Sequence, residues 1–490
     1  MDERKVKNSF LRNNLWIIVN LLVMFCFLIL ANVNRITNPR PLQKDSAEYL
    51  ELSYHLAFNK TFSYDGVIPT NYREPISSFL NAVNIHLFTD IKDSIDVNQL
   101  GQNLNLVLQL TQINIFYLFL LYIGIWWLHF ILTGSHSWMI FSAFIPMTYF
   151  SISTTYLKNL LSDLPSIVLF VFSACVLLLI NREPKYWKSI LLAILLGLLI
   201  MSKGVFYYLV PIYLFLMISL IWFKDESPFK IQKIKIFALS FLLTFLTILP
   251  WQLRNYIYLD DFSLTTRGGT ILLLRAEMDQ MNSVERVGMF YVFAPEVLKK
   301  VIFEKYFGYE KADYLDGGKL QRLNRDLEHD YRAIEAGDYN QLVSFLRRSM
   351  FISLPILQAE ANLKGLDSDQ YIKEESLKTI KNNWQSHILT SIPFAWKGLW
   401  FYKGNNLVFV LLIGLSYLVF FIMFIKSLIY WKIDYLIFFT LPMLVFFFHV
   451  LLTHNIPRYI LPIVPFISLG LVLFLKEKFS VYRKSNLFKL

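Results

Sequence analysis

Charged residues are scarce in this sequence. They make up 17% of its 490 residues, while hydrophobic residues make up 55%; soluble domains usually carry about 25% charged residues. The basic excess of +11 gathers at the ends of apolar runs and does not form one charged face. This composition excludes an ordinary soluble domain, argues against a nucleic-acid partner and predicts a protein embedded in membrane lipids.

Cysteines and internal repeats are also few or missing. The two cysteines, Cys26 and Cys175, lie inside apolar runs, which excludes a disulfide framework and a thiolate metal site. No set of His, Asp and Glu residues has the spacing of metal ligands, so no metal and no other cofactor is predicted. No internal repeat is visible, which counts against transport because transporters are commonly built from repeats.

Apolar sequence, in contrast, is abundant. Ten runs approach the ~20 residues that are needed to cross the hydrocarbon core of a bilayer. They lie at about 14–33, 112–133, 138–156, 163–180, 186–202, 204–223, 234–252, 406–426, 433–452 and 457–475. We therefore predict an all-α polytopic membrane protein with about ten transmembrane helices.

The distribution of Lys and Arg predicts the topology. These residues concentrate in the N-terminal segment, in alternate loops and in the C-terminal tail, so the positive-inside rule puts both termini in the cytoplasm and makes the first run a retained anchor. Two long segments, 34–111 and 253–405, then fall on the non-cytoplasmic side, where loops of such length are usually functional. The predicted organisation is a transmembrane catalytic module at 1–252, a large and mostly helical outer loop at 253–405, and three last spans with a basic tail at 406–490.

The first outer loop carries an acidic motif. Asp45, Glu48 and Tyr49 lie within about one helical turn and on one face of it. A carboxylate at this place can accept the proton of an incoming hydroxyl or amine. The same pattern also fits a solvated amphipathic helix on the membrane surface.

Two further motifs combine charge with proline. Arg73 and Glu74 precede Pro75 at the head of an amphipathic run; the guanidinium suits a phosphate oxygen, but it also suits an anchor in lipid headgroups. Glu74 can pair with it in either case. Asp163 opens the fourth span two residues before Pro165, where helix capping is the alternative to a functional role.

Three more cations lie at outer junctions of the predicted spans: Lys203 at a tight turn, Arg254 after a Pro-Trp pair, and Arg458 with Tyr459 before the last span. Arginines at such places are often interfacial anchors. Although these charged residues are distant in sequence, the topology puts all of them at one membrane face. Carboxylates together with several cations suit an anionic lipid phosphate as substrate and a base that activates an acceptor.

These motifs resemble the GT-C superfamily of membrane glycosyltransferases, which contains protein O-mannosyltransferases and aminoarabinose transferases. The resemblance is carried by Asp45 with Tyr49, Arg-Glu-Pro at 73–75, Ser-Asp-Leu-Pro at 162–165, Pro-Trp-Gln-Leu-Arg-Asn at 250–255 with Thr-Thr-Arg-Gly-Gly after it at 265–269, and Pro-Arg-Tyr-Ile-Leu-Pro-Ile-Val-Pro at 457–465. It covers most of the chain outside about 280–400. The chain departs from the family where Ser46 follows Asp45 in place of a Glu, and where Arg-Glu-Pro replaces Lys-Pro-Pro, so the identity of the donor stays open.

The resemblance implies an inverting transfer of a sugar from a polyprenyl-phosphate donor to an acceptor glycan, lipid or protein. Asp45 is then the base, with Glu48 and Asp163 as further catalytic candidates. The implied substrate-binding residues are Tyr49, Arg73, Glu74, Lys203, Arg254, Arg458 and Tyr459. The expected location is a bacterial plasma membrane with the active site facing outward.

Two alternatives stay open at this stage. An outer-loop polysaccharide polymerase or ligase also uses lipid-linked donors, but it would centre on a late loop with Arg and His. A lipid-linked-sugar flippase or transporter would need ionisable groups at mid-depth in its spans, and these spans are almost free of them.

Overall fold

The computed structural model describes residues 3–93 and 96–487. Within these ranges the chain is helical and contains no β-strand; one isolated antiparallel bridge joins Ser63 and Pro69. The predicted all-α fold class is therefore confirmed. The chain forms two compact units, which are described separately below: unit 1 comprises 1–265, 415–442 and 462–490, and unit 2 comprises 266–414 and 443–461.

Eight helical stretches of the described residues are long and apolar enough to cross a membrane. They are Asn14–Ile36, Leu104–Thr133, Asp163–Arg182, Val205–Lys224, Lys230–Leu259, Leu407–Ile429, Ile433–Leu452 and Pro457–Phe479. Each coincides with one of the ten predicted runs, and together they make the chain an integral membrane protein.

The remaining two predicted spans are shorter helices, α7 (Met139–Ile152) and α10 (Tyr186–Ser202). At about 1.5 Å of rise per residue, the 14 residues of α7 reach roughly 21 Å, which is less than the ~30 Å of the hydrocarbon core. The predicted run at 138–156 overestimated α7 because the helix ends where Ser153 turns to extended backbone. The count of ten spans is thus not confirmed.

Unit 1 is built from long helices that bury their apolar residues against one another. Besides α7 and α10 it contains α1 (Glu3–Ile36), α6 (Ile113–Thr133), α8 (Thr154–Leu157), α9 (Asp163–Arg182), α11 (Val205–Lys224), α12 (Lys230–Leu259) and α25 (Val464–Leu487), with parts of α22 (Leu407–Ile429) and α23 (Ile433–Leu452). Helix α10 packs on α9 and α12, α6 packs on α9, and α25 packs on α7.

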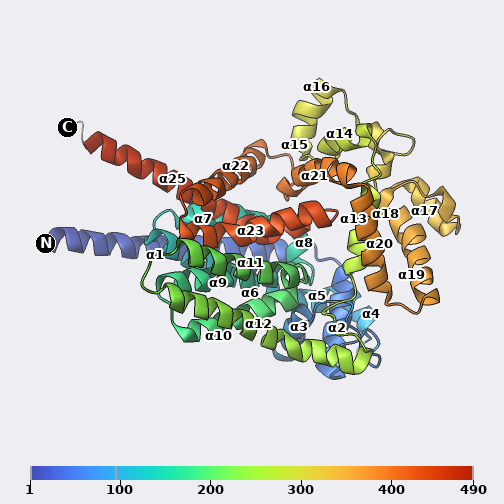
Figure 1. The fold of residues 1–490 in the computed structure, drawn as a ribbon, viewed down its shortest axis with the longest axis horizontal. Coiled ribbons are helices and arrows are strands. Elements are labelled where there is room, and N and C mark those ends of the chain that lie inside the picture. The colour runs from blue at the N-terminus through green and yellow to red at the C-terminus, as the bar shows by residue number, and fades with distance from the viewer. Residues whose placement is uncertain (1–2, 94–95, 488–490) are drawn as a thin grey trace. The chain divides into compact units, whose positions relative to one another are not determined.

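The first outer loop folds into four helices of unit 1: α2 (Asp45–Phe58), α3 (Pro75–Phe88), α4 (Val97–Gln102) and α5 (Leu104–Thr111). They enclose an apolar cluster to which Tyr49, Leu50 and Tyr54 of α2 contribute, together with Ala82 and Ile85 of α3. Figure 1 shows these helices at the end of the unit opposite to the N-terminal part of α1 and the C-terminal part of α25.

Unit 2 contains residues 280–400, the segment that the sequence motifs did not cover. Its helices of eight or more residues are α13 (Gly268–Met278), α14 (Ser283–Val292), α17 (Glu328–Glu335), α19 (Leu354–Leu363), α20 (Ser368–Asn382) and α21 (Trp384–Leu399). Shorter helical turns are α15 (Glu296–Leu298), η1 (Lys299–Glu304), α16 (Lys305–Phe307), η2 (Lys311–Tyr314), η3 (Gln321–Leu323), η4 (Tyr339–Gln341), α18 (Phe345–Arg348), η5 (Ser349–Ser353) and α24 (Pro457–Ile460), while η6 (Leu461–Ile463) lies at the boundary with unit 1.

The core of unit 2 is apolar and aromatic. It gathers Leu274, Met289 and Phe293 from the first two helices, Leu320 from the loop between η2 and η3, and Phe394 from α21. A capping box fixes the start of α14, since the Asn282 side chain accepts from the Glu285 backbone and the Glu285 side chain accepts from the Asn282 backbone. The placement of residues 253–405 on the non-cytoplasmic side stays a prediction.

Candidate active site

Helix α2 places the acidic motif of the first outer loop. Tyr49, Leu50 and Tyr54 turn one face of the helix into the apolar cluster, so Asp45 and Glu48 are left on a face that solvent reaches. Their side chains are 35% and 36% exposed. Lys44, which precedes the helix, has a φ of 53°, a conformation that costs free energy in a non-glycine residue. The chain therefore enters α2 through a constrained turn directly before Asp45.

Arg73 bridges the two carboxylates. Its Nη2 donates to Asp45 Oδ1 at 2.7 Å and its Nε donates to Glu48 Oε2 at 2.7 Å. The Arg73 side chain is only 4% exposed. Burial alone would lower the pKa of the guanidinium, but Tyr49, Asp45 and Glu48 outweigh that effect and the net pKa shift is upward. Arg73 is thus a fixed positive charge that holds two accessible carboxylates.

Tyr49 and Glu74 connect Arg73 to the backbone at Gly204. The guanidinium of Arg73 lies 5.3 Å from the centroid of the Tyr49 ring, and the Tyr49 hydroxyl donates to Glu74 Oε2 at 3.5 Å. The other oxygen of Glu74 accepts from the backbone N–H of Gly204 at 2.9 Å. The sequence suggested that Glu74 pairs with Arg73, and this is corrected: the recorded partners of Glu74 are Tyr49 and Gly204.

Lys203 directly precedes Gly204 in the chain and pairs with Asp163. Lys203 Nζ donates to Asp163 Oδ1 at 2.9 Å, and the two side chains are 11% and 0% exposed. The segment that leads into Asp163 is tied to α2, because the Leu160 backbone N–H donates to Ser46 Oγ at 2.8 Å. Unit 1 therefore brings together seven of the predicted residues: Asp45, Glu48, Tyr49, Arg73, Glu74, Asp163 and Lys203. We call this set, with Gly204, the acidic network.

Arg254 has a different environment. Its guanidinium donates to the carbonyl oxygens of Thr70 at 2.8 Å and Phe62 at 3.2 Å, and it lies 4.9 Å from the ring of Trp251. These contacts fasten the first outer loop to α12. They favour a structural role for Arg254 over the predicted phosphate contact.

Arg458 and Tyr459 belong to α24, which lies in unit 2. The Tyr459 ring stacks on His449 with 4.8 Å between centroids. In the same unit, the backbone N–H of Gly269 donates to Asp369 Oδ1 at 2.7 Å. That position at the start of α13 is filled by a carboxylate of the chain itself.

Sequence reasoning missed one residue of the site. Gly204 was not singled out, although its position directly after Lys203 in a tight turn is a signal for a backbone contact. Elsewhere in unit 1, Lys158 is buried and donates to the carbonyl of Asn38 at 3.2 Å. Its pKa is lowered by burial and by the nearby charge of Arg40.

The charges of the acidic network do not cancel. Four carboxylates, on Asp45, Glu48, Glu74 and Asp163, face two cations, Arg73 and Lys203. Two of the carboxylates are accessible, so the network can accept a proton from a bound hydroxyl or amine. Within the described residues no group of three or more His, Cys, Asp or Glu side chains is placed to hold a metal ion.

No protein-family model and no curated protein matches the sequence. Similar solved structures include the Archaeoglobus fulgidus oligosaccharyltransferase in complex with Zn and sulfate, at 12% identity and a TM-score of 0.48 over 94% of this chain and 50% of that one. Another is the oligosaccharyltransferase AglB from the same organism with an inhibitory peptide and a dolichol-phosphate, at 14% identity and a TM-score of 0.49 over 95% and 51%. This chain spans about half the length of both.

A third similar structure is ArnT from Cupriavidus metallidurans bound to undecaprenyl phosphate, at 12% identity and a TM-score of 0.38, with 93% of this chain and 76% of that chain covered. All three are GT-C membrane glycosyltransferases, the superfamily that the sequence motifs resemble. At identities of 12–14% and TM-scores below 0.5, these similarities do not assign a function to this chain.

Proposed function

We propose that this protein is an inverting glycosyltransferase that moves a hexosyl or pentosyl group from a polyprenyl-phosphate donor to an acceptor glycan, lipid or protein. The observation that carries the proposal is the buried Arg73, which holds the partly exposed carboxylates of Asp45 and Glu48 at 2.7 Å each. A positioned carboxylate that solvent and substrate can reach is what activation of an acceptor requires.

In the proposed reaction the acceptor oxygen or nitrogen attacks the anomeric carbon while its proton passes to Asp45. The bond between the anomeric carbon and the phosphate oxygen breaks, and its electron pair leaves with the polyprenyl phosphate. A single displacement of this kind inverts the anomeric carbon. Arg73 fixes the position of the Asp45 carboxylate, because its Nη2 donates to Asp45 Oδ1.

Donor recognition requires positive charge, and the acidic network itself contains the cations Arg73 and Lys203. Arg73 and Lys203 are both held by carboxylates, so a phosphate would share them with the acidic network and not meet them alone. Arg458 stays a predicted phosphate ligand on sequence grounds. Arg254 is assigned to holding the first outer loop, because carbonyl oxygens of that loop accept from it.

The proposed location is a bacterial plasma membrane with the active site on the outer face. The support is the position of α2 and α3 at the end of unit 1 opposite to both termini (Figure 1), together with the basic N-terminal segment and tail.

The proposal is tested by replacing Asp45 with Asn in the full chain, reconstituted with polyprenyl-phosphate sugars. The amide keeps the size of the carboxylate and can still accept from Arg73, but it cannot take a proton, so we expect turnover to fall by about 10²–10⁴-fold. Asp93→Asn is the matched control, because Asp93 is an exposed carboxylate of the same outer loop. Turnover of Asp45→Asn that equals the control would overturn the proposal.

A further inference from the structure

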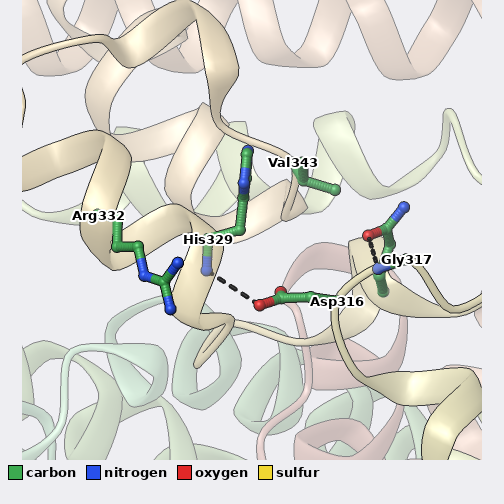
Figure 2. Close-up of a pocket in the computed structure, with 6 residues that line it drawn as sticks. Asp316, Gly317, His329, Arg332 and Val343 are labelled. Carbon is green, nitrogen blue, oxygen red and sulfur yellow. Dashed lines mark hydrogen bonds between the residues drawn. The ribbon is translucent and has the colours of Figure 1, made fainter.

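A polar pocket lies in unit 2, within a segment that no sequence motif covers. It has a volume of about 330 Å³ and is lined by Asp316, Gly317, Gln321, His329, Arg332 and Val343. Figure 2 shows the side chains of Asp316, His329 and Arg332 gathered around it. The volume falls at the small end of the range typical of ligand sites, about 300–1,000 Å³.

The frame of the pocket is held by buried polar contacts. The Asp330 carboxylate, which is fully buried, accepts from the backbone N–H groups of Val343 at 2.7 Å and Ser344 at 3.0 Å. On the other side, the Tyr314 hydroxyl donates to the carbonyl of Leu323 at 3.2 Å. These contacts fix the loop that carries Asp316 and the loop that ends at Val343, so the lining is organised before any ligand binds.

Three lining side chains are each oriented by a backbone group. Asp316 Oδ2 accepts from the backbone N–H of His329 at 3.1 Å, as Figure 2 shows. Gln321 Oε1 accepts from the backbone N–H of Gly317 at 2.9 Å. His329 Nε2 lies 3.0 Å from the carbonyl of Gln341, so Nε2 carries the proton and Nδ1 is an acceptor in the neutral ring. The side chains consequently present a carboxylate oxygen, an amide NH₂ and a ring nitrogen.

This set of groups selects the chemistry of a ligand. Val343 is the only apolar lining residue, which argues against a lipid tail. A phosphate would meet the Asp316 carboxylate, and the one cation of the lining, Arg332, forms an ion pair with Glu328. A neutral ligand with several hydroxyl groups fits best, because each hydroxyl can both donate to Asp316 or His329 and accept from Gln321.

We propose that this pocket binds a neutral saccharide, and that it serves as a docking subsite for a glycan acceptor. The second part rests on the proposed transferase function, while binding itself does not. The pocket would then recognise the uncharged partner of the reaction, in contrast to the anionic lipid donor. Because the lining residues are mostly exposed, extended glycans can reach it without a conformational change.

Direct binding tests the inference without any donor or turnover. The full chain in nanodiscs is probed by saturation-transfer difference NMR with three probes: neutral hexose trisaccharides, trisaccharides that contain uronic acid, and inorganic phosphate, the last observed by ³¹P line broadening. We expect binding of the neutral probes. Asp316→Asn should weaken it about tenfold, the effect of losing a hydrogen bond to a charged group.

Two variants complete the test. In Asp316→Asn the amide oxygen can still accept from the His329 N–H, so the fold is kept; Gln321→Ala should weaken binding independently. Glu335→Gln is the matched control, since Glu335 is an exposed carboxylate on α17 that does not line the pocket. The inference is wrong if the wild-type chain binds no neutral saccharide, if it prefers the anionic probes, or if Asp316→Asn binds like the control.

The saccharide-binding experiment can fail or succeed independently of the proposed transferase function. Loss of turnover in Asp45→Asn with intact saccharide binding supports both proposals. In the transfer assay, Asp316→Asn should raise the KM for a glycan acceptor. The KM for the donor should change less than twofold. Saccharide binding in a chain that shows no transfer leaves the pocket assigned and removes only its role as an acceptor subsite.

Discussion

Arg73 in unit 1 and Arg275 in unit 2 are both buried guanidinium groups that pair with carboxylates, yet their partners differ in exposure. The carboxylates that Arg73 holds, Asp45 and Glu48, are 35% and 36% exposed. Asp279, which pairs with Arg275, is 1% exposed. The same pair of residue types therefore occurs once at a surface that a substrate can reach and once in a closed interior.

The surroundings of Asp279 explain its role. Besides Arg275, the carboxylate has His387 Nδ1 at 2.7 Å and accepts from Thr390 Oγ1 at 2.6 Å. Arg275 in turn donates to the carbonyl of His387 at 3.1 Å and to Ser391 Oγ at 2.9 Å. Every recorded partner lies on α13, α21 or the turn after α13, so this cluster joins two helices of unit 2. An ion pair without access for a substrate stabilises the fold and does not carry chemistry.

The largest difference between the two clusters should appear when each arginine is replaced by Met. Arg275→Met removes the guanidinium from the buried Asp279 and leaves it only His387 and Thr390, which should lower the free energy of unfolding by about 3–5 kcal/mol. Arg73→Met lets water reach Asp45 and Glu48, so its cost should be about 1 kcal/mol. Turnover should nevertheless fall about a hundredfold, because the two carboxylates lose their common anchor.

Hydrogen exchange measured by mass spectrometry on the full chain separates these outcomes. Arg275→Met should increase exchange in α13 and α21, whereas Arg73→Met should leave both unchanged and affect only α2 and α3. Equal destabilisation by the two variants would contradict the distinction between a structural pair and a functional one.

The ionisation of Asp279 gives a second, smaller contrast. Burial alone would raise the pKa of this carboxyl, but His387, Arg275 and Thr390 outweigh it and the net pKa shift is downward. A carboxyl with a lowered folded pKa stabilises the fold above its unfolded pKa, about 3.9, and this contribution is lost as pH falls through the folded pKa. The slope for one proton is at most about 1.4 kcal/mol per pH unit.

Denaturation midpoints between pH 2 and pH 6 check this expectation. Asp279→Asn should remove part of the acid destabilisation that the wild-type chain shows below about pH 4. Arg73 has a raised pKa and remains charged over this range. A wild-type midpoint that does not fall with acid would show that the Asp279 cluster contributes nothing through its charge.

How much the sequence could predict depends on the range of the contacts involved. Hydropathy found the eight long apolar helices because length and composition are local properties, and it overestimated α7, whose end is set by backbone geometry at Ser153. Spacing within one turn identified Asp45 and Glu48. Neither signal carries information about partners 25–130 residues away, such as Glu74 for Tyr49 and for Gly204.

The residues of unit 2 show the same limit more strongly. The pocket around Asp316 and the Asp279 cluster join segments up to 116 residues apart without a motif. Arg254 illustrates the opposite error: an arginine beside Trp at a membrane interface has several ordinary uses, and only its contacts with Thr70 and Phe62 distinguish them.

The smallest expected effect concerns Gly204, where the acidic network touches backbone. A Cβ at this position would lie 3.2 Å from Glu74 Oε1, so Ala must displace that carboxylate by a few tenths of an ångström. Gly204 has a φ of −56°, which Ala adopts freely, and the lower entropy of the unfolded chain should offset the crowding by about 0.4–1 kcal/mol. We therefore expect Gly204→Ala to fold with wild-type stability.

The turnover of Gly204→Ala should still fall about threefold, because small misplacements of reacting groups are costly. A displaced Glu74 moves Tyr49, whose ring lies against the Arg73 guanidinium. That guanidinium anchors Asp45 and Glu48. Gly101→Ala is the control: it lies in α4 of the same outer loop, and its Cβ would meet Leu50 Cδ2 at an ordinary 3.5 Å. Turnover and thermal midpoints are measured for Gly204→Ala and Gly101→Ala under the same conditions. If Gly204→Ala works as fast as Gly101→Ala, the link from Gly204 through Glu74 is structural only, and the functional part of the network ends at Tyr49.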